Sequence, residues 1–396
     1  MEIIMNFIQS AGHLFLYYIL PFVIVLGVMI FFHELGHFLV AKYFNVKVLQ
    51  FALGFGPKIV KKEIGETEYS IRYIPLGGFV KMLGEDIEEE ASQTPRNVKL
   101  GHVLDQDVIE EASQKLSPED EKRAFHNQHA LKRMAIVVAG PVFNLLLALF
   151  LFCGSYMISG NTILTAEAGQ ITENSPASRA GLKQGDIIIS IDGQAVKKWD
   201  DIKGLIQGKA GRSITIAVKR QGEVVNLAIT PEEANSANEF GEAIKTVQIG
   251  IGSSYKYEKI TMNPLQAVTE GFQETWKWIK LTCLVVVKLF EGVVSVKTLG
   301  GPIMIGQLTG ELVQEDVSYL VPFMGIISIN LGILNLFPIP ILDGGLILFL
   351  LIELFTGKPL SLKKREMAQR IGFSLLIALM LLVFYNDILR MFQSKP

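Results

Sequence analysis

A short histidine motif, HELGH, lies inside the first apolar stretch of the chain, with His33 and His37 flanking a turn that begins with Glu34. If this stretch is one helix, the two histidines share a face one turn apart. Two neutral imidazoles at this spacing bind a divalent ion such as zinc, and the neighbouring carboxylate can take a proton from water at an open coordination position. Because ionisable groups inside a bilayer are costly, this cluster predicts a metal site and not a chance match.

A third candidate ligand, Asp343, follows two prolines in NLFPIPILDGG. The surrounding apolar block, 319–355, is too long for one straight span, and its prolines and glycines break it. Irregular backbone at membrane depth is tolerated only where it lines a cavity or packs against protein. We therefore expect Asp343 to start a helix and to be the third ligand, with a proton relay or a helix cap as alternatives. Asn330 and Asn335 are candidate donors to a substrate carbonyl, or structural amides.

Apolar residues are gathered in blocks along the 396-residue chain, which is 49% hydrophobic and has a formal net charge of −2. This composition excludes a disordered chain and a charge-driven nucleic-acid-binding protein. Blocks at 15–40, 134–158, 319–355 and 371–384, the last extended to Ile388, are long enough to cross a bilayer. The fold class is therefore predicted to be a polytopic α-helical membrane protein with about four transmembrane helices.

Basic residues predict the orientation of these spans. Lysines follow the first block at 42–62, and lysines and arginines fill the loop 358–370. The excess of positive charge places both loops in the cytoplasm, so the metal motif lies near the cytoplasmic face. The N-terminus, the long segment before the third span and the C-terminus then face the other side. Residues 1–10 contain no Lys or Arg, so the first block is expected to be retained and not removed as a signal peptide.

The segment between the first two spans divides into two parts. Residues 46–84 are rich in β-branched and aromatic residues broken by glycines, which predicts hairpins lying against the membrane beside the metal helix, or else an ordinary cytoplasmic hairpin domain. Residues 85–130 form an acidic insert, for which a solvated loop without chemistry is expected. The next span opens with AGPVFN, whose small residues allow close helix approach, while Asn144 either lines the site or serves as a structural amide.

A soluble segment, 161–235, contains SPASRAGLKQGDIIISIDGQ and resembles a PDZ domain. Such domains bind an extended peptide at a sheet edge; a size barrier above the membrane is the alternative role. Residues 236–317 predict a strand patch and an amphipathic helix on the outer surface, although a fifth crossing by 284–296 stays open. Residues 300–303 are expected to be a loop leading into the third span.

In order along the chain, HExxH, AFHNQHALKRMAIVVAGPVFN, the PDZ-like segment and NLFPIPILDGG resemble the site-2 protease family of intramembrane metalloproteases. The similarity covers nearly the whole chain apart from the acidic insert. The resemblance implies one zinc ion per chain, held by His33, His37 and Asp343, with Glu34 as catalytic base. It also implies that substrate is accommodated by Asn330 and Asn335 and presented as an extended strand by Gly77, Gly78 and Phe79.

The family resemblance further implies the activity and its setting. The expected enzyme hydrolyses peptide bonds in or near transmembrane segments of single-span proteins, such as anti-sigma factors and remnant signal peptides, in a bacterial inner membrane with the PDZ domain outside. A competing hypothesis is a non-enzymatic, membrane-anchored PDZ scaffold with a structural metal site, which needs a fourth ligand. The remaining histidines, at 13, 102, 126 and 129, lie outside the core motifs. A metal-ion transporter would need polar residues along several spans.

The expected order of regions follows from these observations. It runs as the first transmembrane helix with HExxH (1–45), a membrane-associated β-hairpin region (46–84), an acidic cytoplasmic insert (85–130), the second transmembrane helix (131–160), an extracytoplasmic PDZ domain (161–235), a strand patch and amphipathic helix (236–317), a broken third transmembrane helix (318–356), a basic cytoplasmic loop (357–370), and the fourth transmembrane helix with the C-terminus (371–396).

Overall fold

The computed structural model describes residues 12–85 and 117–393. The chain forms two compact units. The first contains Met1–Cys153, Glu270–Val286 and Ser295–Pro396, and the second contains Gly154–Thr269 and Val287–Val294. Most of the acidic insert, 86–116, lies outside the described residues, and so its predicted structure stays a prediction.

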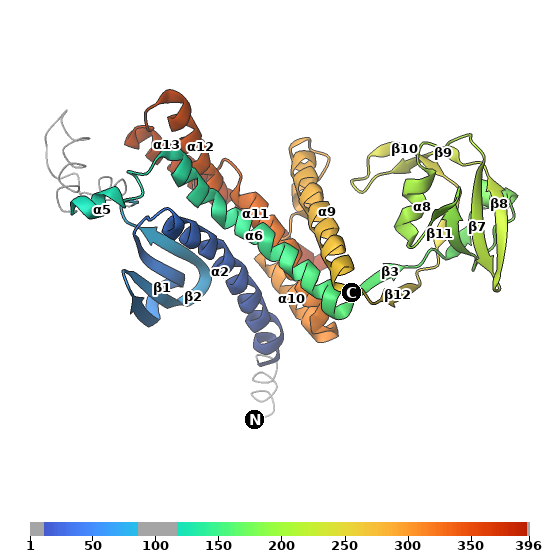
Figure 1. Cartoon of the computed structure of the whole chain (residues 1–396), viewed down its shortest axis with the longest axis horizontal. Helices are drawn as coiled ribbons and strands as arrows, with labels where there is room; N and C mark the ends of the chain where they lie inside the picture. The colour runs from blue at the N-terminus through green and yellow to red at the C-terminus, as the bar shows by residue number, and fades with distance from the viewer. Residues whose placement is uncertain (1–11, 86–116, 394–396) are drawn as a thin grey trace. The chain divides into compact units, whose positions relative to one another are not determined.

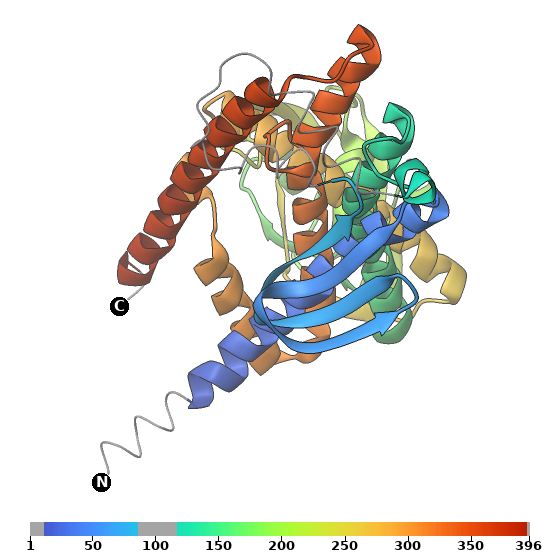
Figure 2. The same ribbon diagram turned by 90° about the vertical axis from the view of Figure 1, so that its left-hand side faces the viewer.

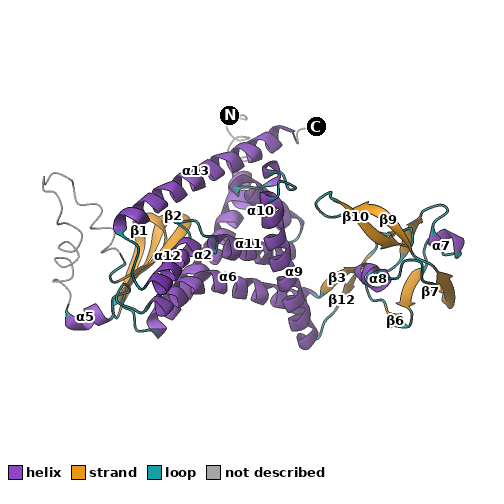
Figure 3. Cartoon of the chain, turned by 90° about the horizontal axis from the view of Figure 1, so that it is seen from above, coloured by secondary structure: helices purple, strands orange, loops and turns teal. Residues whose placement is uncertain are grey.

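Long apolar helices build the first unit (Figures 1 and 3). Among the described residues, four helices are long and apolar enough to cross a membrane, which confirms a multi-pass protein. These four candidate spans are Gly12–Tyr43, Ala130–Ser159, Val317–Asn335 and Leu362–Gln393. The elements within and between them are η1 (Phe15–Ile19), α2 (Leu20–Tyr43), α5 (Pro118–Lys122), α6 (Ala130–Ser159), α9 (Pro264–Phe290), η2 (Val296–Thr298), α10 (Pro302–Glu315), η3 (Val317–Tyr319), α11 (Leu320–Asn335), α12 (Asp343–Thr356) and α13 (Leu362–Gln393).

The break between α11 and α12 falls at the proline-rich run. Helix α11 ends at Asn335, and α12 begins at Asp343. A Cβ atom on Gly344 would lie 2.2 Å from the carbonyl oxygens of Leu336 and Phe337, so the chain folds back tightly on itself here. Only glycine fits at that contact, and the turn it permits sets Asp343 in the first turn of α12.

Helix α10 corrects one expectation, because residues 300–303 are not only a loop: a helix begins at Pro302. Its start is stabilised by the buried carboxylate of Asp387 on α13, which accepts hydrogen bonds from the backbone N–H groups of Gly301, Ile303 and Met304. This partner lies 86 residues from Gly301, beyond the reach of local sequence signals.

Two long strands form a sheet beside α2 (Figure 2). β1 (Val48–Ile64) and β2 (Thr67–Met82) are antiparallel, and Phe51 faces both Val80 and Tyr69. The first half of β1 therefore lies between the two ends of β2. Within the described chain, residues 78–82 pair on one side only and form an edge. Buried Phe51 and Val80 pack in one apolar cluster with Ile136 of α6, which fixes this edge against the helices.

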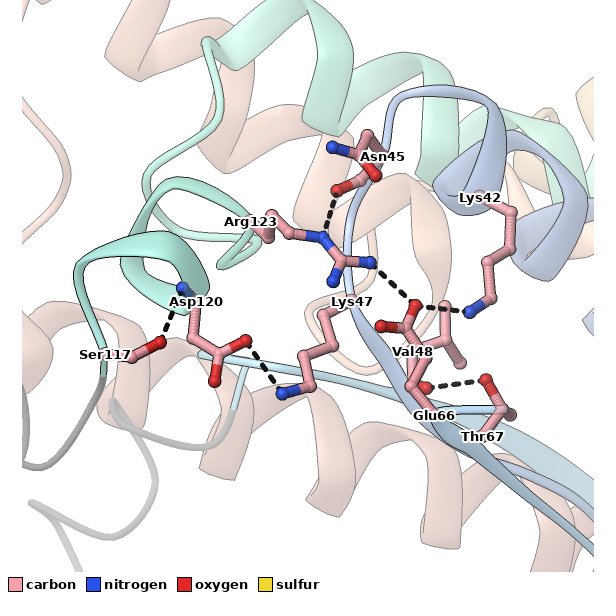
Figure 4. A network of polar contacts seen from close by, with 9 residues as sticks. All are labelled: Lys42, Asn45, Lys47, Val48, Glu66, Thr67, Ser117, Asp120 and Arg123. Atoms are coloured by element: carbon pink, nitrogen blue, oxygen red, sulfur yellow. Dashed lines mark hydrogen bonds and ion pairs between the residues drawn. The ribbon is translucent and has the colours of Figure 1, made fainter. Parts of the chain in front are cut away.

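Charged contacts hold the turn between these strands (Figure 4). Glu66 accepts hydrogen bonds from Lys42 at the end of α2 and from Arg123, each at 2.7 Å. Nearby, Lys47 and Asp120 form an ion pair at 2.7 Å. The Arg123 guanidinium and the Lys42 ammonium lower the pKa of Glu66 from 4.5 to about 2. The network therefore joins the sheet to the metal-motif helix while Glu66 is ionised.

The lowered pKa of Glu66 predicts that this residue stabilises the folded protein in a pH-dependent way. Because its pKa is lower in the folded protein, its contribution is full above pH about 4.5 and is lost as the pH falls toward 2. Glu66→Gln should lower the free energy of unfolding by about 1 kcal/mol at pH 7, a value reduced by solvent screening of this partly exposed group. Thermal unfolding in detergent measures this difference in stability, and Glu63→Gln, at an exposed position, is the control. If the difference from wild type stayed constant below pH 4, Glu66 would not be its source.

Small sheets and two short helices build the second unit (Figure 3). Four strands lie in the order β6-β5-β7-β8, and their buried isoleucines pack with α8. Because β3 pairs with β12 and β4 with β11, the unit continues well past residue 235, where the sequence suggested its end. The PDZ assignment stays a prediction. The elements are β3 (Asn161–Leu164), β4 (Ala168–Ile171), α7 (Pro176–Arg179), β5 (Ile187–Ile191), β6 (Gln194–Ala195), α8 (Trp199–Ile206), β7 (Ile214–Arg220), β8 (Glu223–Ile229), β9 (Glu232–Ala237), β10 (Ala243–Gln248), β11 (Ile251–Ser253) and β12 (Tyr257–Ile260).

Candidate metal centre

Three candidate ligands meet where α2 faces the start of α12. The Nε2 atoms of His33 and His37 lie 3.3 Å apart. Asp343 places Oδ2 3.2 Å from His33 Nε2 and Oδ1 3.6 Å from His37 Nε2. Ligand atoms about 2.0–2.1 Å from a tetrahedral zinc ion are separated by roughly 3.3 Å, so this donor set fits zinc. Asp343 Oδ2 is also buried with no hydrogen-bond donor among the described residues, as expected of an oxygen that faces a cation.

The ring of His37 is held by the backbone of α6. Its Nδ1 lies 2.9 Å from the carbonyl oxygen of Ile136. A carbonyl can only accept, so Nδ1 carries the proton and Nε2 keeps a lone pair for the metal. Sequence reasoning missed this contact, because it depends on the rotation of α6 and not on a side-chain type.

Asn144, for which a lining role and a structural role were both considered, contacts the other histidine. Its Nδ2 lies 3.2 Å from His33 Nδ1, while its Oδ1 is buried with no hydrogen-bond partner among the described residues. Rotation of the amide by 180° would bring Oδ1 to Nδ1, and a protonated Nδ1 would then donate to it. That arrangement satisfies Oδ1 and leaves His33 Nε2 free to bind a metal.

Glycines allow α6 to approach the histidines. A Cβ atom on Gly140 would lie 2.2 Å from His37 Nε2, and one on Gly36 would lie 2.4 Å from the carbonyl oxygen of Ala139. Any larger side chain at either position would push the helices apart. The AGP sequence predicted close approach in general, and the structure shows that the approach is to the histidine rings themselves.

The edge of the sheet lies against the predicted catalytic base. A Cβ atom on Gly78 would lie 2.9 Å from Cγ of Glu34. Gly77, with a φ of +128°, has a backbone conformation that favours glycine. Phe79 lines a cavity of about 940 Å³ whose wall also includes Asp343. Gly78 therefore lies against Glu34, Gly77 directly precedes it in the chain, and Phe79 shares a cavity wall with Asp343.

The two asparagines of α11 differ in position. Asn335 Nδ2 lies 3.5 Å from His33 Nε2, which places this amide at the cluster. Asn330 instead accepts a hydrogen bond at 2.8 Å from the Thr282 hydroxyl on α9. The sequence offered no reason to separate them, because the partner of Asn330 comes from a distant helix.

One buried ion pair near the site was not anticipated. Arg133 on α6 donates to Glu353 on α12, and both side chains are mostly buried. Charged residues within apolar helices are the same signal that marks the histidine motif, and Arg133 and Glu353 carry it as well.

The family comparison agrees with this arrangement. The family model described as peptidase family M50 matches residues 21–379. The chain belongs to peptidase family M50. This confirms the resemblance to the site-2 protease family noted from the motifs. The M50 peptidase is similar to the zinc metalloprotease RasP of Geobacillus kaustophilus, with 33% identity over 94% of this chain and 98% of the relative. It is 31% identical to RasP of Oceanobacillus iheyensis, over 94% of this chain and 99% of the relative.

These findings establish the general activity. The M50 peptidase is a zinc metalloprotease with zinc as its cofactor. The protein is therefore an enzyme, and the alternative of a non-enzymatic scaffold is wrong.

Proposed function

We propose that His33, His37 and Asp343 hold the zinc ion and that Glu34 is the catalytic base of an intramembrane endopeptidase. The observation that carries the proposal is the convergence of the three ligand atoms, all within 4.8 Å of one another, from two helices distant in sequence. Their location in apolar helices suits cleavage in or near the transmembrane segment of a substrate.

Zinc, when bound, supplies a Lewis acid that polarises the scissile carbonyl and makes water more acidic. Glu34 takes the proton from the attacking water as the new C–O bond forms, and it then passes that proton to the leaving amine as the peptide C–N bond breaks. The amide of Asn335 lies beside His33 and would donate a hydrogen bond to the substrate carbonyl oxygen. Asn144 and the Ile136 carbonyl hold the imidazoles in orientation.

The substrate must unwind before it can be cut. A helical segment buries its carbonyls in backbone hydrogen bonds, and in a bilayer those groups need new partners when the helix opens. The edge at residues 78–82 offers backbone N–H and C=O groups that an extended substrate could pair with as an added strand. This edge begins at Gly78, which lies beside Glu34. Gly77, Gly78 and Phe79 would thus present an extended substrate to the base.

The orientation and the partners form part of the same proposal. Loops rich in lysine and arginine face the cytoplasm of a bacterial inner membrane, with the metal site nearer that side. The PDZ-like segment faces outward and screens substrates. Anti-sigma factors and remnant signal peptides would be cut in regulated intramembrane proteolysis during a stress response.

The test is cleavage of a single-span protein co-reconstituted with the full-length peptidase in liposomes. We expect cleavage that a zinc chelator abolishes and added zinc restores. A substrate carrying Gly and Pro in its span should be cut faster than one rich in Leu and Ala, because less helix must be unwound. Cleavage that persisted in chelator would contradict the proposed dependence on a metal. An equal rate for both substrates would contradict the proposed unwinding step.

A further inference from the structure

One face of α6 carries the contacts with His33 and His37 that are described above. Arg133, Ile136, Gly140 and Asn144 follow one another at intervals of three, four and four residues, which places them in one stripe. Ile136 and Asn144 hydrogen-bond to the two imidazoles, and Gly140 lies against both rings. Arg133, the first residue of the stripe, instead contacts Glu353 on α12.

Arg133 pairs with Glu353 of α12 in a mostly buried position. The side chains are 8% and 16% exposed, and the guanidinium also donates through Nε to the carbonyl oxygen of Gln128 at 3.0 Å. Removing either partner would leave the other charge poorly solvated, which is strongly unfavourable. The two helices are therefore held in one register at this point.

Helix α12 carries Asp343 at its start and Glu353 further along. At a rise of about 1.5 Å per residue the two carboxylates lie about 15 Å apart along the helix axis. Leu350, between them, is buried in the same apolar cluster as Ile136 and Val137 of α6. The contact of Gly344 with the Leu336 and Phe337 carbonyls holds the start of α12. A helix held at both ends has a fixed rotation, and that rotation determines where Asp343 points.

We propose that the Arg133–Glu353 ion pair is a positioning device for the metal site. Helix α6 orients the two imidazoles, and through Arg133 the same helix sets the rotation and height of α12, which brings Asp343 to them. The inference rests on the proposed His33–His37–Asp343 zinc site. Arg133 and Glu353 are positioning residues that touch neither metal nor reacting atoms.

Arg133 also lines the 940 Å³ cavity, which raises direct substrate contact as a competing role. The two roles predict different effects of changing Glu353. Glu353 is absent from the described residues that line this cavity. Its loss should therefore leave the affinity for substrate unchanged but alter the position of α12. Parallel effects of changing either partner indicate positioning, and an effect of Arg133 alone indicates substrate contact.

The experiment compares full-length Glu353→Gln, Arg133→Met and Arg133→Lys with wild type. Lys132→Met is the matched control, because it removes an exposed positive charge from the same turn of α6. Zinc affinity is measured by competition with a chelator, alongside thermal unfolding and the kcat and KM for a single-span test substrate. We expect Glu353→Gln and Arg133→Met each to weaken zinc affinity several-fold, up to the roughly 10–100-fold typical of groups that hydrogen-bond directly to metal ligands. Arg133→Lys should weaken it less, and KM should change little.

Three results would overturn the inference. Zinc affinity equal to wild type in Glu353→Gln would remove the positioning role, even if thermal stability fell. A raised KM in Arg133→Met with unchanged zinc affinity would make Arg133 a substrate contact. Equal losses in Lys132→Met would show a general effect of charge. If the proposed zinc ligands were themselves wrong, a different result would show it: Asp343→Asn would bind zinc as tightly as wild type.

Discussion

Glu34→Gln is expected to keep its zinc and to lose cleavage, with kcat lower by about 10²–10⁴-fold. The amide has nearly the volume of the carboxylate, so contacts with Gly78 and the packing of α2 should persist. It cannot take a proton from water at neutral pH, so the attacking water stays a poor nucleophile. The rate of cleavage of a reconstituted single-span substrate and the zinc content of the same sample, measured together, test this.

Glu34→Asp is the informative companion to this variant. It keeps a carboxylate but shortens its reach, so we expect a rate between those of wild type and Glu34→Gln. Unimpaired cleavage by Glu34→Gln would show that another group moves the proton. Loss of zinc from that variant would assign Glu34 a role in holding the metal.

Asp343→Asn is expected to lose both zinc and cleavage. The neutral amide is a weak ligand, and the remaining pair of imidazoles supplies only two strong donors. Because even groups that merely orient ligands are worth about 10–100-fold in metal affinity, loss of a ligand should weaken zinc binding by more than about 100-fold. Chelator competition measures the affinity, and residual cleavage is followed as zinc is added back.

Asp200→Asn, at an exposed position on α8, is the control for the loss of one carboxylate and should behave as wild type. A fully zinc-loaded Asp343→Asn protein would contradict the proposed ligand set, whatever its activity. Partial recovery of cleavage at high zinc would agree with weakened binding at an otherwise intact site.

Spacing and helix breaks in the sequence predicted which residues the structure brings together in the candidate site. The HExxH interval places two imidazoles on one helical face, and the prolines before Asp343 indicate a helix that starts within the membrane. Four apolar blocks predicted the spans. All of these signals are local, because each depends on residues within a few turns of one another.

Features that depend on helix rotation could not be predicted in this way. The carbonyl of Ile136 contacts His37 only because α6 turns one face toward α2. Asn330 bonds to Thr282, a partner 48 residues away, although its sequence context resembles that of Asn335. The start of α10 likewise depends on Asp387 of another helix. Tertiary packing decides each of these contacts.

The distance along the chain between the two halves of the metal site also bears on biosynthesis. His33 belongs to the first span, whereas its neighbour Asn335 is 302 residues further on, and Asp343 comes later still. If Asp343 is the third ligand, as proposed, a nascent chain carries the histidine motif through nearly the whole of translation without a complete ligand set. Since an incomplete site holds zinc weakly, proteolytic activity would then begin only after α12 has inserted. Prematurely terminated chains that lack α12 would be inactive toward the membrane proteins being made beside them.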